Sequence, residues 1–115
     1  MEKLEQIRYL RRKAHARLKE LRSPVYESFL AMEKAAYAGG ALPVKTKELI
    51  AVGISVATDC ESCMEWHIRQ AGQAGATHQE ILEAIDVGME LPAGRATVAA
   101  RFALEVMEEV FPRGA

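Results

Sequence analysis

The sequence is poor in aromatic residues and has no long apolar run. Only 6% of its 115 residues are Phe, Trp or Tyr, although half are hydrophobic. Small and aliphatic side chains must therefore fill the core. Because Ala favours helices and is depleted in strands, this composition predicts packed helices rather than a sheet. The longest strongly apolar run, Leu49 to Ala57, is far too short for a membrane-spanning helix of roughly 20 residues, so no membrane association is expected.

Excess charge of either sign and a targeting segment are also lacking. The net charge of -1 provides no general attraction to nucleic acid or to an anionic membrane. The opening residues, MEKLEQIRYL, are charged from the second position and contain no apolar h-region. We therefore expect a cytoplasmic protein with no nucleic-acid partner. Thiols stay reduced in that compartment, so a pair of cysteines there predicts catalysis or metal binding rather than a structural disulfide.

Helix signals divide the chain into about six helices in a single domain. Pro24 suits the first position of a helix, and Thr77 with Glu80 fits a capping box. Pro92 followed by Gly94 predicts a break before the last helix. The predicted N-caps are Ser23, Thr58 or Asp59, and Thr77. The expected all-α domain spans residues 1–115, with N-terminal helices in 1–40, a core region in 42–94 and a C-terminal helix in 95–111.

Three of these helices have distinctive surfaces. The helix over residues 2–22 is strongly basic, but it lacks interleaved aromatic residues, which favours a solvated face or docking on an acidic neighbour over a nucleic-acid arm. From Leu49 onward the third helix is apolar on every side, which predicts a buried central helix. The last helix has two apolar faces, which suggests either a partner chain or wrapping within one domain.

Both cysteines lie in the segment ATDCESCMEWHIRQAG, with a histidine four residues further on. On a helix, Cys60 and Cys63 are neighbours, as are Cys63 and His67, so all three share one stripe. The positive end of the helix dipole would favour a thiolate in the first turn, and His67 could act as a base or stabilise the anion. The stripe therefore predicts a nucleophile, a resolving thiol and a base, without deciding which sulfur attacks.

Two other interpretations of the cysteines remain open. Free Cys is a common small core residue, and the pair could be apolar filler. Cys60, Cys63, His67 and one carboxylate would also supply the four ligands of a zinc or redox-sensing site. Zinc ligands usually come from two separate segments, however, and the sequence has no second Cys/His cluster; His15 and His78 stand alone.

Glu48 precedes the C-x-x-C by twelve residues, at the start of the apolar helix. The segment TKELIAVGISVATDCESCMEWH resembles the alkyl hydroperoxidase D-like branch of the carboxymuconolactone decarboxylase family. The similarity covers roughly Leu42 to Gly94 and includes Glu48, both cysteines and the histidine at family spacing. From its position alone, Glu48 would more often be a solvated first-turn residue favoured by the helix dipole.

The resemblance implies an all-α homo-oligomer, a trimer or hexamer, whose redox-active Cys60–Cys63 pair reduces hydroperoxides without a bound cofactor or metal. It assigns Cys63 as the attacking thiol, Cys60 as the resolving thiol, and Glu48 with His67 as a proton relay. An external dithiol, carried by a lipoyl-bearing protein in the best-studied relatives, would reset the site. Ser62 departs from the family peroxidase, which has an additional His there, and the lactone decarboxylases lack the cysteine pair, so decarboxylation is not expected.

Overall fold

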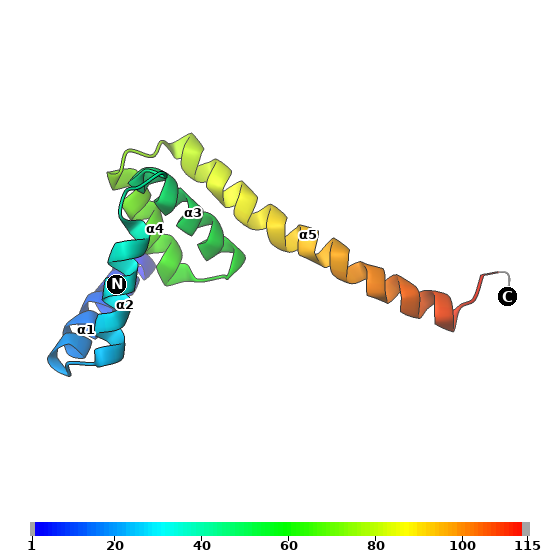
Figure 1. Ribbon diagram of the computed structural model, residues 1–115, viewed down its shortest axis with the longest axis horizontal. Coiled ribbons are helices and arrows are strands. Elements are labelled where there is room, and N and C mark those ends of the chain that lie inside the picture. The colour runs from blue at the N-terminus through cyan, green and yellow to red at the C-terminus, as the bar shows by residue number, and fades with distance from the viewer. Residues whose placement is uncertain (1, 114–115) are drawn as a thin grey trace.

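The computed structural model describes residues 2–113, which contain five α-helices and no strands (Figure 1). The helices are α1 (Lys3–Glu20), α2 (Pro24–Tyr37), α3 (Val44–Ala57), α4 (Glu61–Gln73) and α5 (His78–Val110). The predicted all-α fold is confirmed. The ends of the expected domain, residue 1 and residues 114–115, lie outside the described part. No helix in residues 2–113 combines the length and apolar character needed to cross a membrane.

Three helix ends share one chain reversal, the Schellman motif, in which the residue after the C-cap has a positive φ. These residues are Arg22 (φ 52°), Asp59 (φ 52°) and Gly75 (φ 94°). In each motif the next backbone N–H returns to the preceding helix: Ser23 to Leu18, Cys60 to Ser55 and Ala76 to Ala71, with N···O distances of 3.4, 3.0 and 2.9 Å. The reversals bring α1 against α2, and α3 against α4.

The N-caps agree with the sequence at two helices and differ at a third. Ser23 Oγ accepts from the Tyr26 N–H at the start of α2, and Thr77 forms the predicted capping box at the start of α5. The predicted cap of α4 by Thr58 or Asp59 is wrong, because these residues complete the end of α3. Cys60 occupies the N-cap instead.

The predicted break after residue 91 is also wrong, and the chain has five helices rather than about six in its described part. Helix α5 continues through Pro92 to Val110. A proline inside a helix removes one backbone hydrogen bond and crowds the carbonyl four residues earlier, but it does not forbid a helix. The alanine-rich segment that follows, ATVAARFALEV, has strong helix propensity and supports the continuation.

Helix α3 is not buried on every side, contrary to the expectation. One face is buried by α4 and α5 and contains Ala51 and Val52. On the other face, the Ile50 and Ile54 residues remain 48% and 58% exposed. This face lines an apolar groove of about 460 Å³ between α3 and α5. Two neighbouring helices cover only part of the circumference of α3, so its remaining apolar side has no partner among the described helices.

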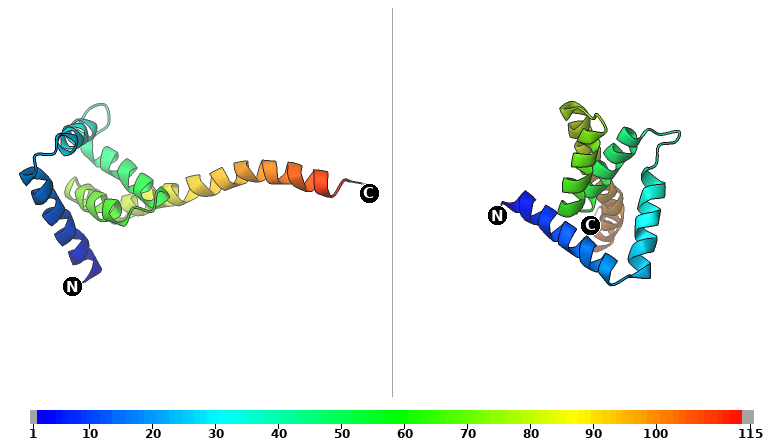
Figure 2. Two further views of the ribbon diagram at one scale, coloured as in Figure 1. Left: turned by 90° about the horizontal axis from the view of Figure 1, so that it is seen from below. Right: turned by 90° about the vertical axis from the view of Figure 1, so that its left-hand side faces the viewer.

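The second half of α5 extends away from the other four helices (Figures 1 and 2). The radius of gyration is 20.0 Å, whereas a compact chain of this length would have about 13 Å. Large apolar side chains remain exposed along this extension: Val98, Phe102, Leu104, Val106, Met107 and Val110. Among residues 2–113, only Ala51, Val52 and Ala71 are buried hydrophobic residues. An isolated chain therefore leaves these large apolar side chains exposed to water.

Glycines mark the crossing of α3 and α5. A Cβ atom added to Gly88 would lie 2.5 Å from the Gly53 carbonyl oxygen, 3.1 Å from the Gly53 Cα and 3.0 Å from the Val56 Cβ. The two backbones approach each other this closely because neither glycine carries a side chain. A methyl group at Gly88 would therefore have to push α5 away from α3.

We expect Gly88→Ala to lower the free energy of unfolding by about 1–2 kcal/mol, since overpacking outweighs the better helix propensity of Ala. Gly72→Ala in α4 is the matched control, because its added Cβ would meet nothing within 4 Å; it should raise stability by up to about 1 kcal/mol. Urea denaturation at one chain concentration measures both. Equal shifts of the same sign would contradict the close crossing.

Helix α1 docks on α4 through a buried carboxylate. The Glu65 side chain is 3% exposed and accepts hydrogen bonds from Arg8 on α1 (3.2 Å), Arg11 on α1 (2.7 Å) and Arg69 on α4 (2.6 Å). Lys3 also pairs with Glu61 at the surface. The basic first helix is thus docked on an acidic neighbour, one of the two arrangements that the sequence favoured.

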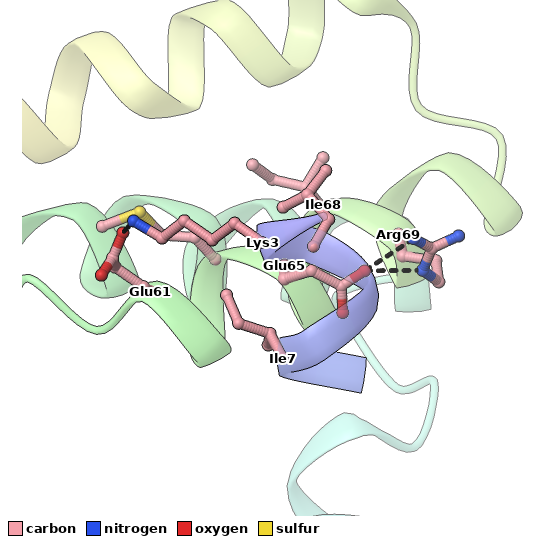
Figure 3. A pocket seen from close by; sticks show the side chains of 8 residues that line it. Lys3, Ile7, Glu61, Glu65, Ile68 and Arg69 are labelled. Carbon is pink, nitrogen blue, oxygen red and sulfur yellow. Dashed lines mark hydrogen bonds and ion pairs between the residues drawn. The ribbon is translucent and has the colours of Figure 1, made fainter. Parts of the chain in front are cut away.

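A groove of about 580 Å³ separates the first turns of α1 from α4 (Figure 3). Its apolar lining comes from Leu4 and Ile7 of α1 and from Met64 and Ile68 of α4. Charged groups stand at its edges, where Figure 3 shows Glu65 held by Arg69 and Glu61 held by Lys3. Polar contacts at its edges, rather than a continuous apolar core, therefore hold α1 in place.

Candidate redox site

The two cysteines form a disulfide at the start of α4. The Sγ atoms of Cys60 and Cys63 are bonded, with the Cα atoms 5.2 Å apart. Cys60 precedes the first turn of α4, and its Sγ accepts a hydrogen bond from the Cys63 backbone N–H at 3.3 Å. Both residues are partly buried. The interpretation of the pair as unbonded apolar filler does not describe this arrangement.

The turn between α3 and α4 places Cys60 at this cap. Asp59 adopts the left-handed conformation, which Asp tolerates better than most residues. The Cys60 N–H then bonds to the carbonyl of Ser55, a buried residue whose hydroxyl in turn donates to the Ala51 carbonyl at 2.6 Å. The Cys60 sulfur therefore lies on a turn whose backbone is hydrogen-bonded to the buried face of α3.

Glu48 and His67 form a close pair beside the disulfide-bearing turn of α4. The Glu48 carboxylate lies 2.7 Å from His67 Nδ1. Glu48 is only 5% exposed, so it is not the solvated first-turn residue that its position alone suggested. Because a carboxylate only accepts hydrogen bonds, Nδ1 carries the hydrogen, and in the neutral imidazole Nε2 would then be the acceptor nitrogen. The tertiary structure thus brings Glu48 to the histidine of the C-x-x-C helix.

Tyr37, at the end of α2, is a member of the site that the sequence did not reveal. Its ring stacks on His67 with the centroids 5.1 Å apart, and its hydroxyl oxygen lies 3.5 Å from His67 Nε2. Burial raises the pKa of the Tyr37 hydroxyl, and the negative charges of Glu48 and Glu33 raise it further. The hydroxyl therefore keeps its proton. No spacing rule links residue 37 to residue 67, because they meet only through packing of separate helices.

Ser62, where the family peroxidase has an additional His, is held by α1. Arg11 donates to the Ser62 carbonyl oxygen at 2.8 Å and to its hydroxyl oxygen at 3.2 Å. The same guanidinium binds Glu65 and lies 5.2 Å from the centroid of the Trp66 ring. A fixed positive charge therefore adjoins the interior of the C-x-x-C.

Residues 2–113 contain no arrangement of side chains that matches the alternative metal site. No three His, Cys, Asp or Glu side chains in this part of the chain are grouped so that they could hold an ion. The two other histidines stand away from the cysteines in the fold: His15 contacts the Tyr26 hydroxyl, and His78 begins α5. Cys60 and Cys63 are joined in a disulfide, so neither sulfur is a thiolate ligand in this structure.

The fold and the site define a class of all-helical proteins with a C-x-x-C disulfide at the start of one helix and a Glu–His pair between α3 and α4. The sequence profile of the carboxymuconolactone decarboxylase family matches residues 23–106. The chain belongs to this family, which confirms the resemblance. The match includes the disulfide, Glu48, His67 and Tyr37, and leaves out α1.

Two curated relatives share most of the chain. One, named uncharacterized protein 4 in cox locus, from Paracoccus denitrificans, is 44% identical over 84 residues, which are 73% of this chain and 76% of that protein. An uncharacterized protein from Cupriavidus necator is 35% identical over 77 residues, or 67% and 68% of the two chains. Neither relative's name states an activity.

Solved structures of the family have the same fold. A carboxymuconolactone decarboxylase family protein from Legionella pneumophila superposes with a TM-score of 0.75 and 30% identity, covering 95% of this chain and 97% of that one. A family protein from Thermotoga maritima, for which a part in the antioxidative response has been suggested, gives a TM-score of 0.69 and 28% identity. It covers 91% of this chain and 89% of its own.

Proposed function

We propose that the protein is a thiol peroxidase that reduces hydroperoxides through Cys60 and Cys63. The observation that carries this proposal is the Cys60–Cys63 disulfide at the start of α4, with His67 one turn after Cys63 on the same helix and paired with the buried Glu48. Membership of the carboxymuconolactone decarboxylase family and the antioxidative role suggested for the Thermotoga maritima protein support it. The chain's own residues supply the nucleophile, the resolving thiol and a base.

In the proposed reaction, the Cys63 thiolate attacks the terminal oxygen of the hydroperoxide and breaks the O–O bond. The alkoxide takes a proton and leaves as the alcohol, while Cys63 becomes a sulfenic acid. The Cys60 thiolate then attacks this sulfur and forms the disulfide, and the displaced hydroxide takes a proton and leaves as water. Two thiols of an external dithiol regenerate the pair by exchange and become a disulfide themselves. The assignment of Cys63 as the attacking thiol follows the family resemblance.

His67 and Glu48 would manage the protons in this cycle. Nε2 of the neutral imidazole can accept the proton of a thiol, while the Glu48 carboxylate holds Nδ1–H and stabilises the imidazolium that forms, as carboxylates do for catalytic histidines. The reductant we propose is a dithiol, such as the dihydrolipoyl group of a carrier protein. Comparing dihydrolipoamide, dithiothreitol and glutathione at equal thiol concentration tests this preference.

Anaerobic titration of the reduced protein with a hydroperoxide tests the proposal directly. One equivalent of peroxide should remove two thiols per chain, and excess dithiol should sustain turnover. Trp66, the only tryptophan, lies three residues after Cys63 and provides a fluorescence signal for stopped-flow kinetics. The proposal fails if the thiols react no faster than free cysteine, or if no disulfide forms. Comparing hydrogen peroxide with an organic hydroperoxide identifies the preferred oxidant.

We also propose that the active form is a homo-oligomer in which the extension of α5 is covered. Phe102 is 71% exposed and Phe111 is 72% exposed, and the groove between α3 and α5 is apolar. Exposed apolar surface of this extent is typical of an interface between chains. Light scattering should therefore give a mass that is a multiple of 12.7 kDa, a trimer or hexamer by family resemblance. A mass of one chain at micromolar concentration would contradict this.

A further inference from the structure

The Tyr37 hydroxyl faces Nε2 of His67, which is the ring nitrogen that the proposed chemistry needs. Glu48 already engages Nδ1, so only Nε2 remains to accept a proton from a thiol. The Tyr37 hydroxyl lies 3.5 Å from this nitrogen, at the outer limit of a hydrogen bond. His67 is therefore held between two helices, by a carboxylate from α3 and a phenol from α2.

We propose that Tyr37 is a positioning residue of the redox site, whose ring fixes the plane of His67 and whose hydroxyl keeps Nε2 as the acceptor nitrogen. This inference rests on the proposed function and extends it to a helix that lies before the C-x-x-C region. The stacked rings restrict rotation of the imidazole, since their planes are 28° apart with the centroids at 5.1 Å. Rotation of the ring about the Cβ–Cγ bond would carry Nδ1 away from the Glu48 carboxylate and Nε2 away from the Tyr37 hydroxyl.

The state of the hydroxyl is consistent with this role. Burial, followed by the charges of Glu48 on α3 and Glu33 on α2, raises the pKa of Tyr37, so that the phenol remains a donor at neutral pH. Lys47 on α3 is engaged elsewhere, since its ammonium donates to the Ala38 carbonyl at 2.6 Å. A neutral phenol facing Nε2 favours the tautomer in which Nδ1 carries the hydrogen.

The Tyr37 hydroxyl can also influence the transfer of a proton from a thiol to His67 Nε2. The Tyr37 hydroxyl faces Nε2 at 3.5 Å while the site is a disulfide, and it must move aside for Nε2 to take the proton of a thiol after reduction. The phenol can then rotate aside without leaving a buried charge. Loss of the hydroxyl should therefore leave the tautomer of the His67 imidazole less well defined. Loss of the whole Tyr37 ring should also remove the contact that orients the imidazole plane.

Three variants separate these effects. Tyr37→Phe keeps the stacked ring and removes the hydroxyl, and Tyr37→Leu removes both. Tyr26→Phe is the matched control, because the Tyr26 hydroxyl contacts His15 in another Tyr–His pair, between α1 and α2. The readouts are the 15N resonances of the histidine ring and the pH profile of disulfide reduction by dithiothreitol, followed by the rate of peroxide oxidation.

We expect Tyr37→Phe to shift the Nε2 resonance of His67 toward that of a free acceptor and to slow both reactions by about 2- to 10-fold, the effect of one hydrogen bond. Tyr37→Leu should mix the two tautomers, slow the reactions by about 10- to 100-fold and alter the pH profile. Tyr26→Phe should leave the rates within about 2-fold of the wild-type values.

Wild-type resonances and rates in both Tyr37 variants would overturn the inference, as would an equal loss in Tyr26→Phe, which would indicate a general effect on helix packing. The 15N signature and the reduction by dithiothreitol involve no peroxide. Failure of peroxide turnover in the wild-type protein, with the His67 signature still dependent on Tyr37, would therefore overturn the proposed function alone.

Discussion

Cys63→Ser is expected to abolish hydroperoxide turnover, with a loss of at least about 10³-fold, as removal of a nucleophile produces in other enzymes. A serine hydroxyl is a far weaker nucleophile than a thiolate at neutral pH. Cys60→Ser should behave differently, because Cys63 can still react with one equivalent of peroxide. The resulting sulfenic acid should persist in Cys60→Ser, where a sulfenic-acid probe and mass spectrometry detect it on residue 63.

The comparison of these two variants decides which sulfur attacks. The sequence contains no other cysteine, so no third thiol can substitute. The structure also provides a reason to test the reverse assignment, because Cys60 Sγ accepts the Cys63 N–H at the positive end of α4. Sulfenic acid on residue 60 in Cys63→Ser, with none on residue 63 in Cys60→Ser, would reverse the two roles. Equal turnover in wild type and both variants would refute the peroxidase itself.

Glu65→Gln is expected to lower the free energy of unfolding by about 2–3 kcal/mol, less than a fully buried ion pair because the three arginines keep some exposure to water. Their side chains are 29% (Arg8), 25% (Arg11) and 44% (Arg69) exposed. The amide would leave these guanidinium groups without a negative partner and would point its own donors toward them. Helix α1 should detach before the remainder unfolds.

Glu61→Gln is the matched control, since Glu61 also connects α4 to α1 but is 59% exposed. Its loss should cost less than about 1 kcal/mol, as is typical of a surface pair. Urea denaturation with hydrogen-exchange mass spectrometry measures the overall loss and locates it. Equal effects of the two variants, or unchanged protection of α1 in Glu65→Gln, would contradict the anchoring role of Glu65.

The contribution of Glu65 should also depend on pH. Burial by itself would raise the pKa of Glu65, but hydrogen bonds from Arg69, Arg11 and Arg8 outweigh it and lower the pKa to about 2. A carboxylate with a lowered pKa stabilises the folded state above its unfolded pKa, near 4.5, and loses this contribution as the pH falls toward 2. The stability difference between wild type and Glu65→Gln should therefore be constant above about pH 5 and shrink progressively as the pH falls from 4.5 toward 2. A difference that grows in acid would contradict this sign.

Much of the site could be predicted because its parts are local. Cys60, Cys63 and His67 lie within eight residues, where helix periodicity places side chains on one side and the start of the helix favours an anion. Glu48 could be chosen only through the family resemblance, since its position in the chain favoured a solvated residue. Its distance of 2.7 Å from His67 depends on the packing of α3 against α4.

The sequence by itself therefore determined the helical class, the family, most helix starts and the placement of Cys63 and His67 one turn apart on α4, with Cys60 directly before that helix. Only the tertiary structure decided that Tyr37 stacks on His67 and that Glu65 accepts hydrogen bonds from three arginines. It also decided that one apolar face of α3 stays exposed and that α5 continues through Pro92. The physical reason is the distance along the sequence over which each effect acts. Caps and periodicity depend on neighbours within about four residues, whereas burial and pairing depend on which distant segment arrives at a given face.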